Sequence, residues 1–233
     1  LEDCFKSYKE QCVSEDDEEM DWMHINTIQW LGNGQVLLSS RETSTIIFID
    51  DLYENPQVKY MIGEESFWEN TEYKDLLLEK DESSQSFSNT GGQHSITYVK
   101  DDTLDAGEYY LYMFNNNFGK SSTNPSYDWN HIDGIETSAT VDDDSKASYF
   151  YKYKVDENNN TYTLVQSFEV PFSPYVSSVQ EYDGNLIIDS GMKGVFGEYD
   201  ADGNLIQQFK MKLSDQYIYR VYKYTFTDFY FSE

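Results

Sequence analysis

The stretch WLGNGQVLLSSRETSTIIFID, residues 30–50, decides the fold because it reads as two short apolar strands with a turn before them. The GNG triplet at 32–34 predicts a tight turn that leads into the strand VLLSS. STIIFID at 44–50 follows as the hairpin partner of that strand. This stretch therefore indicates antiparallel β-structure.

The same pattern returns later in the chain. VQEYDGNLIIDSG (179–191) repeats it, and GVFGEYDADGNLIQQF (194–209) continues it with another turn. The copies align without a gap, with Gly184 lying 150 residues after Gly34. We interpret this offset as three units of about 50 residues, a period typical of propeller blades.

The rest of the chain supports an all-β reading. The stretches 107–119 and 147–170 predict further hairpins, and residues 67–80 are the one helix-like stretch. At four short strands per blade, residues 21–233 predict about four blades of a β-propeller, whereas closed propellers have four to eight. The chain begins at Leu1, so we expect an incomplete ring whose earlier blades and secretion signal precede it.

Composition and charge restrict the function. The chain has 233 residues with 21 Tyr and 14 Phe, which suits half-buried pleated sheets. Its 43 Asp and Glu against 16 Lys and Arg give a net charge of −27, which disfavours nucleic-acid binding. No apolar run is long enough to predict a membrane span.

Residues 1–20 form an acidic linker that contains both cysteines, Cys4 and Cys12. These cysteines have no metal-ligand spacing. They form either a disulfide that closes a short loop in an oxidising compartment, which we predict, or two free thiols.

The stretch DWMHINTIQW, residues 21–30, poses a question about burial. A period of two places His24 and Asn26 on the same face as the apolar Trp22 and Ile28. Either both polar side chains are hydrogen-bonded in the core, or that face opens into a site.

The chain has three histidines. His94 follows a pair of glycines and begins a strand, and Arg41 ends the strand LLSSR. Taken alone, each of these residues is more often structural than functional. His131 lies in the polar loop YDWNHIDG, and we assign it to the surface. In DADGN (200–204) the spacing suits a calcium loop, but a hairpin turn is the better interpretation.

The runs DWMHIN, LLSSRETSTIIFID and GQHSI, in this order, resemble the bacterial arylsulfate sulfotransferases. The resemblance continues through YMFNNNFG, SPYVSSVQEYDGNLIIDSG and YRVYKY, and so covers nearly the whole chain from Asp21. It implies a six-bladed propeller with its active site at the central channel. It also implies sulfuryl transfer from a phenolic sulfate ester to an acceptor phenol, without the nucleotide donor PAPS.

The resemblance also implies roles for individual residues. His94 matches the nucleophile that becomes a sulfohistidine in a ping-pong reaction. His24, Asn26 and Arg41 match residues that bind the sulfuryl oxygens or assist the phenol oxygen. The family uses a further histidine from an upstream blade, and no histidine precedes His24 here.

The partners implied are small phenols and aryl sulfate esters, with no cofactor and no metal. The family includes dimers, so a homodimer is compatible with the resemblance, and the expected location is periplasmic or at the cell surface. The alternative is a non-catalytic propeller that binds a protein or a glycan, because a fold alone does not define a function.

Overall fold

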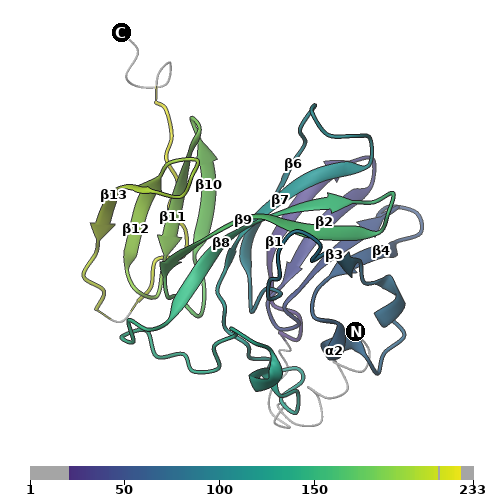
Figure 1. Ribbon diagram of the computed structural model, residues 1–233, viewed down its shortest axis with the longest axis horizontal. Coiled ribbons are helices and arrows are strands. Elements are labelled where there is room, and N and C mark those ends of the chain that lie inside the picture. Colours follow the sequence, from purple (N-terminus) through teal and green to yellow (C-terminus); the bar gives the residue numbers. More distant parts are fainter. Residues whose placement is uncertain (1–20, 215, 227–233) are drawn as a thin grey trace.

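The chain is all-β apart from short helical turns (Figure 1). The computed structural model describes residues 21–214 and 216–226, so the predicted linker with Cys4 and Cys12 lies outside the described residues. Three mainly antiparallel sheets follow one another along the sequence. The first contains β1 (Ile25–Gly32), β2 (Gln35–Ser40), β3 (Thr45–Asp50) and β4 (Gln57–Ile62).

The second sheet has longer strands and a fifth member. Its spatial order is β5-β9-β8-β7-β6, in which only β5 is parallel to its neighbour. The strands are β5 (Glu79–Lys80), β6 (His94–Val99), β7 (Glu108–Asn115), β8 (Ala147–Asp156) and β9 (Thr161–Pro171). The third sheet contains β10 (Ser178–Tyr182), β11 (Asn185–Ser190), β12 (Val195–Tyr199) and β13 (Leu205–Lys210).

The predicted repeat is present in the structure. β11 begins and ends 150 residues after β2, and each strand is the second in its sheet. The turns before them share one backbone conformation: Asn33 and Gly34 have φ of 50° and 78°, and Asp183 and Gly184 have φ of 52° and 78°. Asn, Asp and Gly tolerate positive φ, which tight hairpin turns require.

The predicted number of units between the copies is wrong. One sheet, not two, separates the first sheet from the third. The error arises because β8 and β9 are long and because residues 116–146 join β7 to β8 as one extended connection. The described residues thus form three sheets where about four blades were predicted.

Residues 218–225 continue beside β10 without forming a strand. Val221 N donates to Ser178 Oγ (3.0 Å), and Lys223 N donates to Gln180 Oε1 (2.7 Å). Side chains of β10 therefore hold this segment in place of a main-chain ladder.

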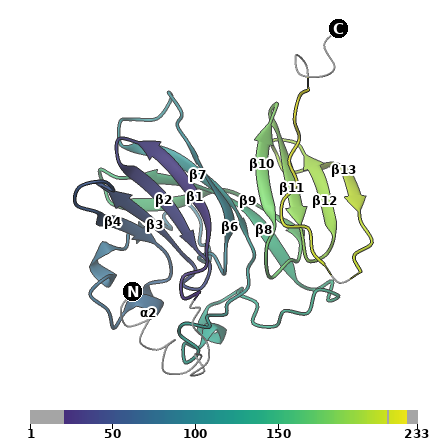
Figure 2. The same cartoon turned by 180° about the vertical axis from the view of Figure 1, so that it is seen from behind.

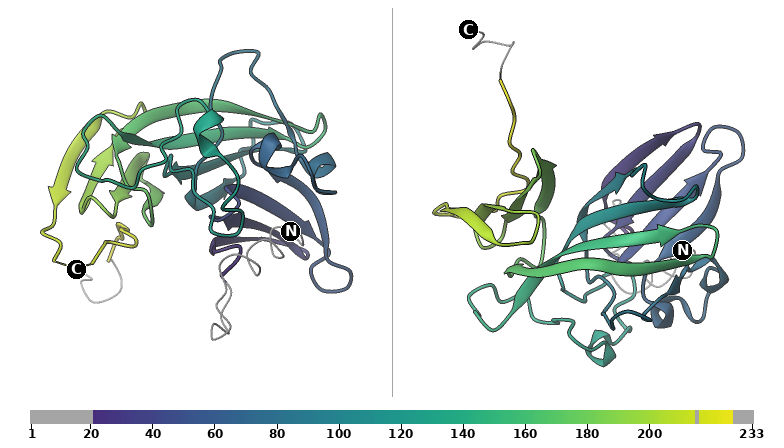
Figure 3. Two further views of the ribbon diagram at one scale, coloured as in Figure 1. Left: turned by 90° about the horizontal axis from the view of Figure 1, so that it is seen from below. Right: turned by 45° about the horizontal axis from the view of Figure 1, so that its top comes forward.

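The three sheets are arranged around an arc, consistent with a propeller-like fold (Figures 2 and 3). One edge strand of each sheet lies beside the others, with β6 in contact with both β1 and β10. Ser95 links all three, because its N–H donates to Thr27 Oγ1 (3.0 Å) and its hydroxyl donates to the main-chain oxygen of Val179 (3.1 Å).

The middle sheet is buried on both faces. Leu111 and Met113 of β7 belong to a core cluster with the first sheet, whereas Tyr112 and Phe114 belong to a cluster with the third. Adjacent residues of a strand point to opposite faces, so a sheet enclosed on both sides needs continuous apolar sequence. This explains the unbroken run YYLYMF in β7.

In the helix-like stretch at 67–80, the helical residues belong to two short turns, α2 (Glu65–Trp68) and η1 (Lys74–Leu76), and the last two residues form β5. Trp68 of α2 is fully buried and donates from its indole N–H to Thr45 Oγ1 (3.0 Å). Among the described residues, no helix is long and apolar enough to cross a membrane.

The DADGN stretch is the turn between β12 and β13. Asp200 Oδ1 accepts hydrogen bonds from the N–H groups of Asp202 (3.0 Å) and Asn204 (2.8 Å). These bonds lower the pKa of Asp200, with the Asn204 side chain as the largest cause. The hairpin interpretation of this stretch is confirmed.

Asp189 of β11 is a buried carboxylate with neither oxygen hydrogen-bonded within the described part of the chain. Burial raises its pKa from 3.8 to about 7. Ser39 holds the corresponding position in β2 and exchanges hydrogen bonds with Gln93. Asp189 has no such partner, so ionising it in the folded protein is unfavourable.

We predict that Asp189→Ser stabilises the protein at neutral pH by a few kcal/mol. The folded state binds the proton more tightly than the unfolded state, so the wild type loses stability as pH rises from about 4 to about 7. Urea unfolding at about pH 4 and about pH 8 measures the difference. The exposed Asp202→Ser is the control, and an equal gain for Asp189→Ser at both pH values would contradict the explanation.

Candidate active site

His94 is the first residue of β6, and among the described residues its ring is hydrogen-bonded through Nδ1. Its Nδ1 lies 3.0 Å from Gly92 O and 2.8 Å from Asn116 Oδ1. The amide of Asn116 donates through Nδ2 to Ser173 O (2.7 Å) and Val176 O (3.0 Å), which fixes its Oδ1 toward the imidazole. Both neighbours of Nδ1 are acceptors, so Nδ1 carries the proton and Nε2 has the free lone pair.

The imidazole is neutral over a wide pH range. His94 is 4% exposed, and burial lowers its pKa to about 4. The hydrogen bond to Asn116 opposes this shift, and the positive charge of Arg41 adds to it. A neutral, oriented imidazole is the form that acts as a nucleophile.

Arg41 follows β2 directly and is 3% exposed. Its Nη1 donates to Glu42 Oε1 (2.8 Å) and to Lys120 O (2.9 Å). Its Nε and Nη2 are buried and have no hydrogen-bond partner among the described residues. A buried guanidinium with free N–H groups is suited to receive an anion.

Aromatic rings enclose the guanidinium of Arg41. Its Cζ lies 4.8 Å from the ring centroid of Tyr175 and 5.7 Å from that of Phe118. Gly92, with φ of 65°, brings its backbone close to the same side chain, and a Cβ there would lie 3.5 Å from Arg41 Nε. These contacts connect the Arg41 turn to the segment that precedes His94.

Asn26 connects β1 to the same segment. Its Nδ2 donates to Gln93 O (2.7 Å), and its Oδ1 accepts from Thr27 Oγ1 (3.1 Å). The Gln93 side chain donates in turn to Ser39 Oγ (3.2 Å) and Thr45 O (3.2 Å). Asn26 is therefore buried and hydrogen-bonded, and its partner is the residue that precedes His94.

The predicted strand alternation is wrong at His24. β1 begins at Ile25, and His24 precedes it with φ of 48°, so the two-residue period does not extend to it. The His24 ring is exposed and bonds through Nδ1 to the carboxylate of Asp21, while its main-chain oxygen accepts from Arg41 N (3.2 Å). Ile28, predicted to share a buried face with Asn26, is 64% exposed.

The structure thus brings together the segments that carry the four predicted residues, at the start of β1, the end of β2 and the start of β6. Arg41 bonds the backbone of His24, Asn26 bonds the residue before His94, and the charges of Arg41 and His24 both lower the pKa of His94. His131 lies apart at the surface, as predicted, and its Nε2 contacts Ser66 Oγ (3.1 Å).

Three further residues of this region were missed by the sequence argument. Asn116 orients His94, and Tyr175 covers Arg41. Arg220, which lines a cavity of about 340 Å³ between β1 and β6, donates from Nη2 to Asn26 O (2.9 Å). The runs YMFNNNFG, SPYVSSVQEYDGNLIIDSG and YRVYKY, which contain these residues, were part of the family resemblance, but no pattern in them singled out Asn116, Tyr175 or Arg220.

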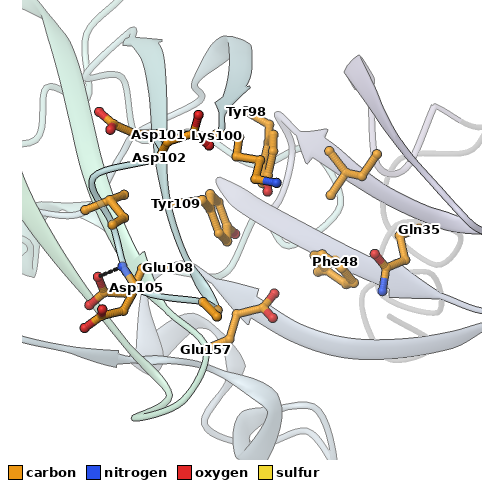
Figure 4. A pocket seen from close by; sticks show the side chains of 14 residues that line it. Gln35, Phe48, Tyr98, Lys100, Asp101, Asp102, Asp105, Glu108, Tyr109 and Glu157 are labelled. Atoms are coloured by element: carbon orange, nitrogen blue, oxygen red, sulfur yellow. Dashed lines mark hydrogen bonds between the residues drawn. The ribbon is translucent and has the colours of Figure 1, made fainter.

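Another cavity lies at the opposite end of β6 (Figure 4). It has a volume of about 500 Å³, and Tyr98, Tyr109 and Phe48 provide its aromatic walls. The carboxylates that also line it are Asp101, Asp102, Asp105, Glu108 and Glu157. This negative charge disfavours an anion, so the His94 end is the candidate anion site.

The described residues contain no group of three or more His, Cys, Asp and Glu side chains placed to hold a metal ion. His94 contributes an oriented imidazole to the site, and Arg41 contributes a guanidinium with two nitrogens that lack hydrogen-bond partners among the described residues. Both groups lie where β2 ends and β6 begins. The class of protein that the fold defines is an all-β, propeller-like protein.

A family model described as arylsulfotransferase (ASST) matches residues 2–220. The chain belongs to the arylsulfotransferase family, and the resemblance noted in the sequence is confirmed. A comparison with curated proteins finds no match.

Solved structures show distant likeness. A functionally unknown protein from Desulfotomaculum acetoxidans is 11% identical with a TM-score of 0.37, covering 80% of this chain and 41% of that one. A protein of unknown function from Bacteroides caccae is 9% identical with a TM-score of 0.36, covering 81% and 46%. A hypothetical selenium-binding protein from Sulfolobus tokodaii is 9% identical with a TM-score of 0.32, covering 62% and 26%. The chain spans less than half the length of each of these structures.

We predict that His94→Asn reduces the acid sensitivity of the fold. The folded pKa of His94 lies below its ordinary value of 6.5, so the wild type loses stability as pH falls from about 6.5 to about 4. The loss attributable to this group is up to about 3 kcal/mol. Urea unfolding across this pH range measures it.

The His131→Asn variant controls for the removal of an imidazole from the surface. The asparagine at 94 keeps an N–H donor for Asn116, which limits structural damage. Parallel pH profiles for wild type and His94→Asn would show that the imidazole is not held neutral.

Proposed function

We propose that this protein transfers a sulfuryl group from a phenolic sulfate ester to an acceptor phenol through a sulfohistidine at His94. One observation carries the proposal: a buried, neutral His94 with a free Nε2 stands beside a buried Arg41 that has two unused nitrogens. Membership of the arylsulfotransferase family supports it. The reaction is ping-pong and needs no PAPS.

In the first half-reaction, the Nε2 lone pair of His94 attacks sulfur. An N–S bond forms, the bond between sulfur and the phenol oxygen breaks, and the phenolate leaves. The sulfated ring keeps its proton on Nδ1, where Asn116 Oδ1 and Gly92 O accept it. These acceptors stabilise the positive ring, which the buried site would otherwise disfavour.

In the second half-reaction, the oxygen of an acceptor phenol attacks the sulfur of sulfohistidine. The N–S bond breaks, its electron pair returns to Nε2, and the phenol gives up its proton. We assign His24 to proton exchange with the phenol oxygen, because its ring is exposed and bonded to Asp21.

Arg41 stabilises the charge that spreads over the sulfuryl oxygens in the transition state. Its free Nε and Nη2 present two parallel donors from one planar group. Low local polarity strengthens such bonds, and Glu42 and Lys120 O hold the opposite side of the guanidinium. Asn26 positions the segment that precedes His94.

The substrate class is small phenols and their sulfate esters, and a periplasmic or cell-surface location and a homodimer remain part of the proposal. The acidic surface, with a net charge of −27, makes a local cation necessary for any anionic donor. Arg41 supplies that cation.

We expect turnover of 4-nitrophenyl sulfate with a phenol acceptor to be abolished by His94→Asn. Incubating the wild type with donor alone should add one sulfuryl group to the peptide that contains His94, detected by mass spectrometry. His131→Asn should react like the wild type. Full turnover by a folded His94→Asn protein would reject the nucleophile, and binding without any transfer by the wild type would favour a non-catalytic module.

We expect Arg41→Lys to lower the transfer rate by roughly 100- to 1000-fold, the effect of losing one oriented donor in such a site. Lysine retains the charge but not the planar pair of N–H groups. Steady-state kinetics with 4-nitrophenyl sulfate test this. A rate within a fewfold of the wild type would show that charge alone suffices.

A further inference from the structure

The loop at 172–177, between β9 and β10, contacts both the residues around His94 and Arg41. Main-chain oxygens of Ser173 and Val176 accept the hydrogen bonds of Asn116, the residue that orients His94. Tyr175, between them, lies over the guanidinium of Arg41. One short loop therefore reaches the proposed nucleophile and the proposed anion-binding group.

The backbone of this loop is strained and firmly held. Val176 and Ser177 have φ of 55° and 89°, and positive φ is a marked outlier for a β-branched valine. Ser177 Oγ donates to Ser173 Oγ (2.8 Å) and accepts from Gly191 N (3.1 Å), which keeps the loop in place. Such strain persists where the surroundings over-determine a conformation, often at functional sites.

The side chain of Tyr175 is less confined than its neighbours. Pro174 and Val176 are buried, whereas Tyr175 is only half-buried. Its ring packs edge-on against Phe118, with centroids 5.2 Å apart, and Phe118 is itself fully buried. With the loop backbone fixed, rotation of the Tyr175 side chain is the simplest movement that this contact allows.

Tyr175 is a half-exposed side chain that lies against the guanidinium of Arg41, with Cζ 4.8 Å from its ring centroid. The Nε and Nη2 atoms of Arg41 have no partner and almost no exposure, so a sulfuryl oxygen reaches them only after a covering group moves. Phe118 is buried in the core, whereas Tyr175 is half-exposed, so Tyr175 is the ring that can move more easily. Moving Tyr175 forfeits its cation–π contact with Arg41.

An aryl sulfate can compensate for the lost cation–π contact, whereas inorganic sulfate cannot. The aromatic ring of an aryl sulfate can stack against the displaced Tyr175, whereas a bare anion offers no such surface. We propose that Tyr175 is a specificity-determining residue that makes the Arg41 site select aryl sulfate esters over inorganic sulfate. This inference rests on the proposed function, because it names the selectivity of that same anion site.

The test measures binding without transfer. In the His94→Asn protein, isothermal titration calorimetry with potassium sulfate and with 4-nitrophenyl sulfate gives two Kd values and their ratio. Adding Tyr175→Ala should tighten sulfate by roughly twofold to tenfold and weaken 4-nitrophenyl sulfate by a similar factor. Tyr175→Phe keeps the ring and should leave both Kd values within about twofold.

The matched control is Tyr53→Ala in the same background, because Tyr53 is 75% exposed and packs on Trp30 rather than at the site. An unchanged ratio for Tyr175→Ala would overturn the inference, whether both affinities stay or fall together, and so would the absence of binding of both anions to the His94→Asn protein. The ratio does not depend on turnover, so failure of sulfuryl transfer and failure of this selectivity are recorded separately.

Discussion

Packing on both faces of the middle sheet is the constraint on which the rest of the structure depends. Alternate residues of β7 enter two different apolar clusters, one shared with each neighbouring sheet. Since both clusters are close-packed, β6 and β7 cannot tilt toward one neighbour without opening a gap at the other. His94 and Asn116, at the same end of these two strands, take their fixed separation from that packing.

Buried amides then connect the ends of the sheets. Gln93 ties the first sheet to the start of β6, and Asn116 ties the end of β7 to the loop before β10. Each amide donates to groups that would otherwise be left unpaired away from water. The consequence for His94 is chemical as well as structural, because the orientation of Asn116 decides which ring nitrogen holds the proton.

Unlike these buried amides, Arg41 is buried with some of its hydrogen-bond donors unpaired. A buried guanidinium with unused donors is costly, since charge and N–H groups both lose water. Glu42 compensates the charge, and Tyr175 and Phe118 offer aromatic faces, but Nε and Nη2 stay unsatisfied. Leaving these N–H groups unpaired reduces the stability of the folded protein, and an anion that accepted hydrogen bonds from them would remove this cost on binding. The loop that contains Val176 is a second unfavourable feature of the folded state near Arg41, because Val176 has a positive φ.

Local sequence was sufficient to predict the strands and the hairpin turns at Asn33–Gly34 and Asp183–Gly184. It also indicated His94 and Arg41 as candidate site residues. Turns and strands depend on residues that are a few positions apart in the sequence, so local patterns are enough to predict them. The number of sheets between the two copies, the conformation of His24 and the parts played by Asn116 and Tyr175 were decided only in three dimensions. Asn116 contacts segments that begin at Gly92 and at Ser173, and Tyr175 meets a guanidinium from the first sheet. No local pattern encodes these meetings, because they arise from the packing of sheets that are distant in sequence.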